Sequence, residues 1–104
     1  PNLPRDTYPA LNERVRALVY NGDWDACVPY TDNEAWTEGM GYAAADPWHP
    51  WAYAGGQVGG YATRYATPHN FTFITVRGGR HEVPETQPQR ALHMFKTFID
   101  GGIF

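Results

Sequence analysis

Residues 77–84 of this 104-residue chain read Arg-Gly-Gly-Arg-His-Glu-Val-Pro, and they decide how its fold is interpreted. The run before them, residues 71–76, is Phe-Thr-Phe-Ile-Thr-Val, whose aromatic and β-branched residues predict a strand. A helical pattern follows over residues 87–99. Because glycines allow a sharp turn, we expect His81 on a loop between a strand and a helix, at the edge of a sheet. The alternative is a glycine turn that carries an ordinary surface histidine. The apolar face expected for the helix consists of Ala91, Leu92, Phe95, Phe98 and Ile99.

A second apolar run, residues 15–20, reads Val-Arg-Ala-Leu-Val-Tyr and follows a short helix predicted over residues 7–14. Its near-continuous apolar character is typical of a strand in a parallel sheet that is covered on both faces. Asn-Gly-Asp at positions 21–23 then turns the chain. Asp23 and Asp25 therefore follow the carboxyl end of the strand, where catalytic groups collect in open α/β sheets.

The middle of the chain is less regular. Residues 31–40 predict a helix, capped by Thr31 or Asp32. Residues 41–57 are rich in Gly, Ala, Pro and Trp and are interpreted as an irregular loop. Residues 57–65 alternate weakly and predict one strand of a hairpin. A capping box formed by Thr86 and Gln89 is expected at the start of the last helix.

Composition narrows the function classes. The length fits a single domain segment over residues 1–104, and the net charge of −3 gives no reason to expect nucleic acid or an anionic membrane as partner. No apolar run is long enough to cross a membrane. Cys27 is the sole cysteine, so no internal disulfide can form, and the chain contains no serine. The spacing of histidines and acids gives no recognisable metal set, and no cofactor is expected.

The order of elements carries the first functional inference. Strand, acidic turn, helix, strand, histidine turn and helix follow one another as in the last part of an α/β-hydrolase, whose triad runs nucleophile, acid, histidine along the chain. The acid orients the histidine and stabilises its protonated form, while the histidine moves the proton of the nucleophile. Without a serine, this chain by itself cannot be a complete serine hydrolase.

Three motifs, in the right order, resemble the serine carboxypeptidase family. They are Asn-Gly-Asp-Trp-Asp-Ala-Cys-Val-Pro at 21–29, Trp-His-Pro-Trp at 48–51 with Gln-Val-Gly-Gly-Tyr at 57–61, and the 77–84 stretch. The last helix adds Pro88, Ala91, Met94, Phe95 and Phe98 to the resemblance. The resemblance implies a small chain or C-terminal segment of an α/β-hydrolase fold, completed by a separate large chain. That large chain would carry the nucleophilic serine, the oxyanion hole and most of the site for the substrate's terminal carboxylate.

The same resemblance assigns roles to individual residues. Asp25 would be the triad acid, His81 the general base, and Asp23 a structural carboxylate that bonds the backbone of the turn. Glu82 would line the pocket of the leaving residue and, if ionised, favour a basic one; the alternative is a surface acid. Cys27 lies near the position of a substrate-pocket thiol in some relatives, one residue further on. For Cys27 a pocket-lining thiol and a buried inert thiol both stay open, whereas the neighbouring motif residues argue against a nucleophilic pair with His81.

One departure from the family concerns the glycines before the histidine. Many relatives have Gly-Ala-Gly where this chain has Gly78, Gly79 and Arg80, so Arg80 must accept a backbone geometry that suits glycine. The other histidines are given structural interpretations: His49 packs between tryptophans, His69 lies in a turn, and His93 lies on the polar side of the last helix.

Asn70-Phe71-Thr72 is a glycosylation sequon. It has meaning in a secretory protein, and the resemblance implies a vacuolar, lysosomal or extracellular location. The implied reaction releases single residues from peptide C-termini through an acyl-enzyme, and dimers of the two-chain unit are one arrangement to expect. Alternatives are a serine carboxypeptidase-like acyltransferase, a hydroxynitrile lyase and a catalytically dead binding relative.

Overall fold

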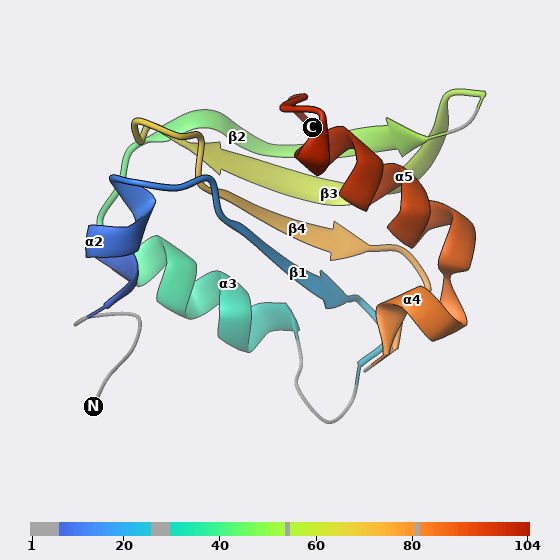
Figure 1. Cartoon of the computed structure of the whole chain (residues 1–104). Helices are drawn as coiled ribbons and strands as arrows, with labels where there is room; N and C mark the ends of the chain where they lie inside the picture. Colours follow the sequence, from blue (N-terminus) through green and yellow to red (C-terminus); the bar gives the residue numbers. More distant parts are fainter. Residues whose placement is uncertain (1–6, 26–29, 54, 81) are drawn as a thin grey trace.

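A computed structural model describes residues 7–25, 30–53, 55–80 and 82–104. They form a mixed four-stranded sheet with the strand order β1-β4-β3-β2 (Figure 1). The bounds are Leu18–Gly22 for β1, Ala44–Tyr53 for β2, Gln57–Tyr65 for β3 and Thr72–Val76 for β4. The pair β1 and β4 is parallel, whereas β3 is antiparallel to both β4 and β2. The hairpin and the two strong strands predicted from the sequence thus share one sheet.

Helices cover both faces of the sheet (Figure 1). On one face lie α4 (Val83–Thr86) and α5 (Pro88–Ile99), and on the other lie α2 (Tyr8–Asn12) and α3 (Tyr30–Gly39). The core under α5 contains Trp51, Ala62, Ile74, Val76, Val83, Ala91 and Met94. The core on the α3 face contains Tyr65, Phe71 and Phe73, packed by residues that include Trp36 and Met40. Since all five residues of β4 are buried, the strand that leads to the histidine turn is the centre of the fold.

The predicted irregular loop over 41–57 is wrong, because most of it is strand β2. Trp51 is 2% exposed, and its indole Nε1 donates to the Thr75 carbonyl at 2.8 Å. The ring fits because Gly59 leaves space for it: a Cβ there would lie 2.3 Å from the ring. Pro47 and Pro50 are tolerated since β2 lies at the edge of the sheet and its register is irregular.

The first strand begins three residues later than the prediction, at Leu18 instead of Val15. Val15 is 50% exposed. The Arg16 guanidinium donates to the carbonyl of Phe98 and lies 5.1 Å from the centre of the Phe98 ring. Residues 15–17 therefore connect α2 to the sheet and hold the end of α5.

The buried face of α5 also differs from the prediction. Ala91 and Met94 are buried and Phe95 is half-buried, whereas Leu92 and Ile99 are 69% and 70% exposed. The helix is rotated relative to the prediction because Ala91, Met94 and Phe95 are the residues that contact the sheet. His93 is half-buried rather than on a polar side, and its ring stacks at 6.3 Å on Trp51.

The predicted caps are wrong as well. No side-chain cap bond forms at the start of α5, whose N-cap is Gln87. Thr86 is instead the last residue of α4, and its hydroxyl donates to the Glu82 carbonyl at 3.1 Å. Thr31 lies inside α3, which begins at Tyr30, so it is not the N-cap. Within the described ranges, no helix combines the length and apolar character required to cross a membrane.

Candidate functional site

Two turns leave the same edge of the sheet. The acidic turn carries Asp23 and Asp25, and the described part of the histidine turn is residues 77–80. Gly22 pairs with Val76, so parallel β1 and β4 end side by side. Backbone bonds then join the two turns: Asp23 N donates to Val76 O at 3.2 Å, and Trp24 N donates to Gly79 O at 2.9 Å. The carboxylate Oδ1 of Asp23 accepts from Gly78 N at 2.8 Å. The two turns therefore behave as one cross-bonded unit.

Two glycines permit this close contact. A Cβ on Gly22 would lie 2.1 Å from the Gly79 carbonyl oxygen, far inside any real contact. Gly79 in turn lies 3.0 Å, measured from its ideal Cβ position, from the Gly22 Cα. The backbones of the two turns can approach only because neither residue has a side chain.

Helix α3 supports the acidic turn from the side. Trp36 Nε1 donates to Asn33 Oδ1 at 2.8 Å, and Asn33 Nδ2 donates to Asn21 Oδ1 at 2.6 Å. Asn21 is buried, and its Nδ2 donates to the Gly22 carbonyl at 2.7 Å. This series of hydrogen bonds fixes the end of β1, directly before the two aspartates. The prediction from sequence missed Asn33 and Trp36, which were interpreted only as part of a helix.

Asp25 is buried and ends the described part of the acidic turn, with its N–H donating to the Gly22 carbonyl at 3.3 Å. Asp23 is half-buried, and its carboxylate bonds the backbone of the opposite turn. The two aspartates, which were hard to separate from the sequence, thus differ in burial. His81 and Cys27 lie outside the described residues, so their assignments remain predictions.

The histidine turn is held on its other side by α4 and α5. Arg80 N donates to Thr86 Oγ1 at 3.1 Å, and Gln87 Nε2 donates to the Gly78 carbonyl at 3.4 Å. Gly78 carries the positive φ of the turn, 72°, whereas Arg80 is not among the described residues with a positive φ. Arg80 is therefore outside the left-handed backbone region that favours glycine.

Glu82 lies exposed at the N-cap of α4, one helical turn from Glu85. The protonated Glu85 carboxyl donates a hydrogen bond to the Glu82 side chain, and this bond together with the negative charge of Glu82 raises the pKa of Glu85 above its ordinary value of 4.5. The Glu85 carboxyl, in the first turn of α4, therefore holds its proton more tightly than an isolated glutamate does.

Aromatic side chains line a hollow beside the acidic turn. The cavity is about 370 Å³ and is lined by Asp23, Trp24, Tyr30, Trp48, Tyr61 and Thr75. Trp48 and Tyr61 stack with ring centres 5.7 Å apart, and both are more than 40% exposed. Trp24 is 67% exposed. An open aromatic surface of this kind suits a flat or apolar group of a ligand.

The remaining candidates lie elsewhere. His69 and the exposed Asn70 lie in the turn before β4, at the opposite end of that strand from residues 77–80. The ring nitrogens of His49 lie 2.7 Å from the Pro47 carbonyl and 2.8 Å from the Phe104 carbonyl, so the ring holds the C-terminal residue against β2. Among the residues that the structure describes, no cluster of His, Cys, Asp and Glu could hold a metal ion.

Comparison with known proteins places the chain in a family. The serine carboxypeptidase family model matches residues 2–101. Serine carboxypeptidase-like 21 of Arabidopsis thaliana is 46% identical over 86 residues, which cover 83% of this chain and 17% of that protein. Serine carboxypeptidase 1 of Hordeum vulgare is 44% identical over 90 residues, covering 86% of this chain and 17% of that protein. The chain thus spans about a sixth of the length of these curated relatives, and it belongs to the serine carboxypeptidase family.

Proposed function

We propose that this chain is the C-terminal, small-chain segment of a serine carboxypeptidase, to which it contributes Asp25 and His81. The nucleophilic serine would come from the rest of the protein, as a separate large chain. The observation that carries the proposal is the cross-bonding of the two turns, in which Asp23 Oδ1 accepts from Gly78 N. It holds the turn of Asp25 against the turn that leads to position 81. Family membership supports the chemistry.

In the proposed reaction, His81 removes the proton of the serine as its oxygen attacks the last peptide carbonyl of the substrate. The proton then passes to the nitrogen of the C-terminal residue, which leaves as a free amino acid. Water attacks the acyl-enzyme with the same histidine as base, releasing the shortened peptide and restoring the serine. Asp25 holds the tautomer of the ring and stabilises its protonated form.

Glu82 and Cys27 are proposed to line the pocket of the leaving residue. The exposure of Glu82 at the start of α4, directly after the histidine position, supports contact with the substrate. An ionised Glu82 would favour a basic leaving residue through charge complementarity. The test is the ratio of kcat/KM for blocked dipeptides ending in Arg and in Leu, which Glu82→Gln should lower and the distant control Glu13→Gln should leave unchanged.

Passage through the secretory pathway is part of the proposal. Asn70 is exposed in the turn between β3 and β4, and its sequon can therefore carry a glycan without disturbing either core. The protein would then be located in a vacuole or lysosome or outside the cell.

The deciding experiment uses the chain assembled with the rest of the protein and a fluorophosphonate probe, read by intact mass. A labelled serine on the other part is expected in the unmodified protein. His81→Ala should slow labelling about 10⁴-fold or more, as removal of a triad member does. His69→Ala, at the other end of β4, is the matched control and should label normally. Unchanged labelling of His81→Ala would overturn the proposal.

The same preparation separates the possible reactions of this family. Release of the last residue from a blocked dipeptide supports a carboxypeptidase. Transfer of the acyl group from a glucose ester to an alcohol, without release of the last residue from the dipeptide, would assign an acyltransferase. Cleavage of a cyanohydrin would assign a lyase. No reaction and no label in the assembled protein would assign a catalytically dead relative.

A further inference from the structure

The hydroxyl of Thr86 is bonded to the backbone on both sides of position 81. Its Oγ1 accepts from Arg80 N at 3.1 Å and donates to the Glu82 carbonyl at 3.1 Å. A hydroxyl has one proton to donate and lone pairs that accept, so one side chain can make both contacts. The two partners are the residues directly before and after the proposed general base. We call this pair of hydrogen bonds the Thr86 bridge.

Only one half of the Thr86 bridge follows from helix geometry. A threonine hydroxyl in a helix often bonds the carbonyl four residues earlier, as Thr86 does with Glu82. The bond from Arg80 N has no such local origin, because Arg80 precedes the helix, whose N-cap is Glu82. This second bond therefore ties the histidine turn to the end of α4.

The backbone beside Thr86 is fixed by the core. Gln87 N donates to the Val83 carbonyl at 2.8 Å, and the Gln87 carbonyl accepts from Ala91 N at 2.9 Å. Val83 and Ala91 are each 2% exposed and belong to the core under α5. Gln87 thus joins α4 to α5 through two buried residues, and the Thr86 hydroxyl projects from a backbone that the core holds in place.

The side chain of Gln87 contacts the same turn. Its Nε2 donates to the Gly78 carbonyl at 3.4 Å, and its Oε1 accepts from Arg90 Nη1. The Arg90 guanidinium in turn lies 4.9 Å from the centre of the Tyr53 ring, on strand β2. The turn is therefore bonded to the junction of α4 and α5 at two places, at Gly78 and on either side of position 81.

We infer that Thr86 is a positioning residue for His81. The Thr86 bridge restricts the backbone on both sides of position 81, and so restricts where the imidazole can lie relative to Asp25 and the serine. Displacement of a catalytic group lowers the rate of the chemical step. The inference rests on the proposed function, and it adds a residue outside the triad whose hydroxyl controls kcat.

The first test compares two variants of Thr86 in the protein assembled with its large chain. Thr86→Val keeps the branched shape and removes the hydroxyl, whereas Thr86→Ser keeps the hydroxyl. On a blocked dipeptide, kcat should fall about tenfold in Thr86→Val with KM little changed, and Thr86→Ser should recover most of kcat. An unchanged kcat in Thr86→Val, or equal losses in both variants, would overturn the inference.

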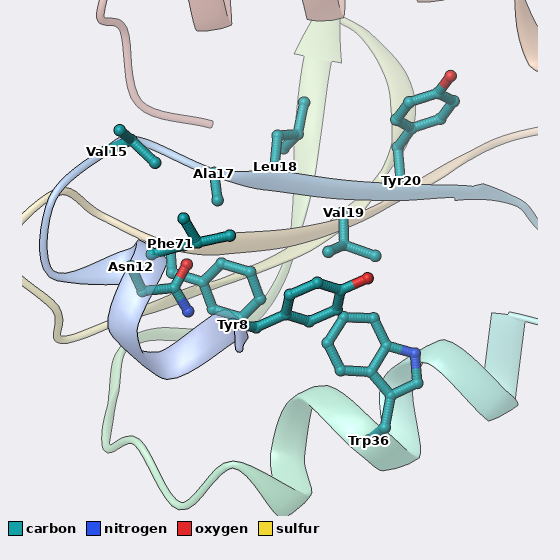
Figure 2. Close-up of a pocket in the computed structure, with 10 residues that line it drawn as sticks. Tyr8, Asn12, Val15, Ala17, Leu18, Val19, Tyr20, Trp36 and Phe71 are labelled. Atoms are coloured by element: carbon teal, nitrogen blue, oxygen red, sulfur yellow. The ribbon is translucent and has the colours of Figure 1, made fainter. Parts of the chain in front are cut away.

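The control is a threonine at the other end of β4. Thr67 Oγ1 accepts from Phe71 N at 2.8 Å. Phe71 lines a hollow of about 390 Å³ beside β1, and Figure 2 shows its ring among the side chains around this hollow. Thr67→Val should lower Tm through the lost hydrogen bond and leave kcat unchanged. A fall in kcat like that of Thr86→Val would show that a general loss of stability is the cause, and would refute the positioning role.

Amide exchange separates this inference from the proposed function, because it requires no turnover. Hydrogen–deuterium exchange of peptides that cover residues 77–85 should be faster in Thr86→Val, through the amide of Arg80, and unchanged in Thr86→Ser. A labelled serine with unchanged exchange in Thr86→Val would refute the Thr86 bridge and leave the proposed catalysis intact. Faster exchange in a protein whose serine reacts with no fluorophosphonate would keep the bridge, but would refute the proposed catalysis and the part of Thr86 in it.

Discussion

The carboxylate of Asp23 and the backbone of Gly78 connect the two turns at the carboxyl end of the sheet: Asp23 Oδ1 accepts from Gly78 N at 2.8 Å. The residues are far apart in sequence but meet because β1 and β4 are parallel neighbours. We therefore expect Asp23 to act as a positioning residue for the proposed pair of Asp25 and His81, through the backbone. The resemblance had implied a bond to its own turn, and the structure gives it a partner in the other turn.

Removing this contact should slow the reaction without weakening substrate binding. Asp23→Ala is expected to lower kcat about 10- to 100-fold with KM little changed, because small displacements of catalytic groups are costly. Asp23→Asn keeps an acceptor oxygen and should recover most of the activity. The measurement is kcat and KM on a blocked dipeptide, together with the rate of fluorophosphonate labelling. Equal losses in the alanine and asparagine variants would contradict a positioning role through this bond.

Gly22 should not tolerate a side chain. Its Cβ would lie 2.1 Å from the Gly79 carbonyl oxygen, so Gly22→Ala must separate the two turns. We expect a loss of about 2–4 kcal/mol in the free energy of unfolding of the assembled protein, measured by denaturant titration. Gly39→Ala is the control, because a Cβ there meets nothing within 4 Å. That variant should be neutral or more stable by up to about 1 kcal/mol. Similar losses in both would show that the contact with Gly79 is not the cause.

The pair of Glu82 and Glu85 should make stability depend on pH. A raised pKa means that the folded chain holds the proton of Glu85 more tightly than the unfolded chain. The stabilisation is therefore complete below the ordinary pKa of 4.5 and is lost as the pH rises through the higher pKa of the folded state. Glu85→Gln keeps a donor without the charge. It should match the unmodified protein in Tm at acidic pH and exceed it at neutral pH.

The corresponding control is Glu13→Gln, which removes an exposed acid after α2. Melting curves from about pH 4 to about pH 7.5 cover the interval in which a carboxyl group with a raised pKa loses its proton. A Tm difference for Glu85→Gln that stays constant with pH would contradict a raised pKa of Glu85 in the folded chain.

Asn70 should carry a glycan when the protein passes through a secretory pathway. The asparagine has φ of 55°, which asparagine accepts more readily than most residues. Its Oδ1 accepts from Arg64 Nη1 at 3.0 Å, and a sugar on Nδ2 leaves that oxygen in place. The intact mass should fall on enzymatic deglycosylation, and Asn70→Asp should remove the effect while preserving the fold. An unmodified mass after secretion would contradict the prediction.

Sequence patterns predicted the elements that depend on short-range rules. The bounds predicted for β3, β4 and α5 differ from the observed bounds by at most one residue. The strand β2 was missed because its prolines and alanines have low strand propensity, and its pairing with β3 supplies what the local sequence lacks. The start of β1 was misplaced because Val15 and Ala17 line a hollow beside the strand, and Arg16 contacts Phe98 of α5.

The sequence by itself determined the family, the order of the acidic and histidine turns, and the absence of a serine from this chain. Each of these depends only on short motifs or on composition. Only the tertiary structure decided which residues of the two turns touch. The Asp23–Gly78 bond, the fit of Gly22 against Gly79 and the support from Asn33 join distant parts of the chain. Their physical basis is the parallel pairing of β1 with β4, a long-range interaction that no single stretch of sequence encodes.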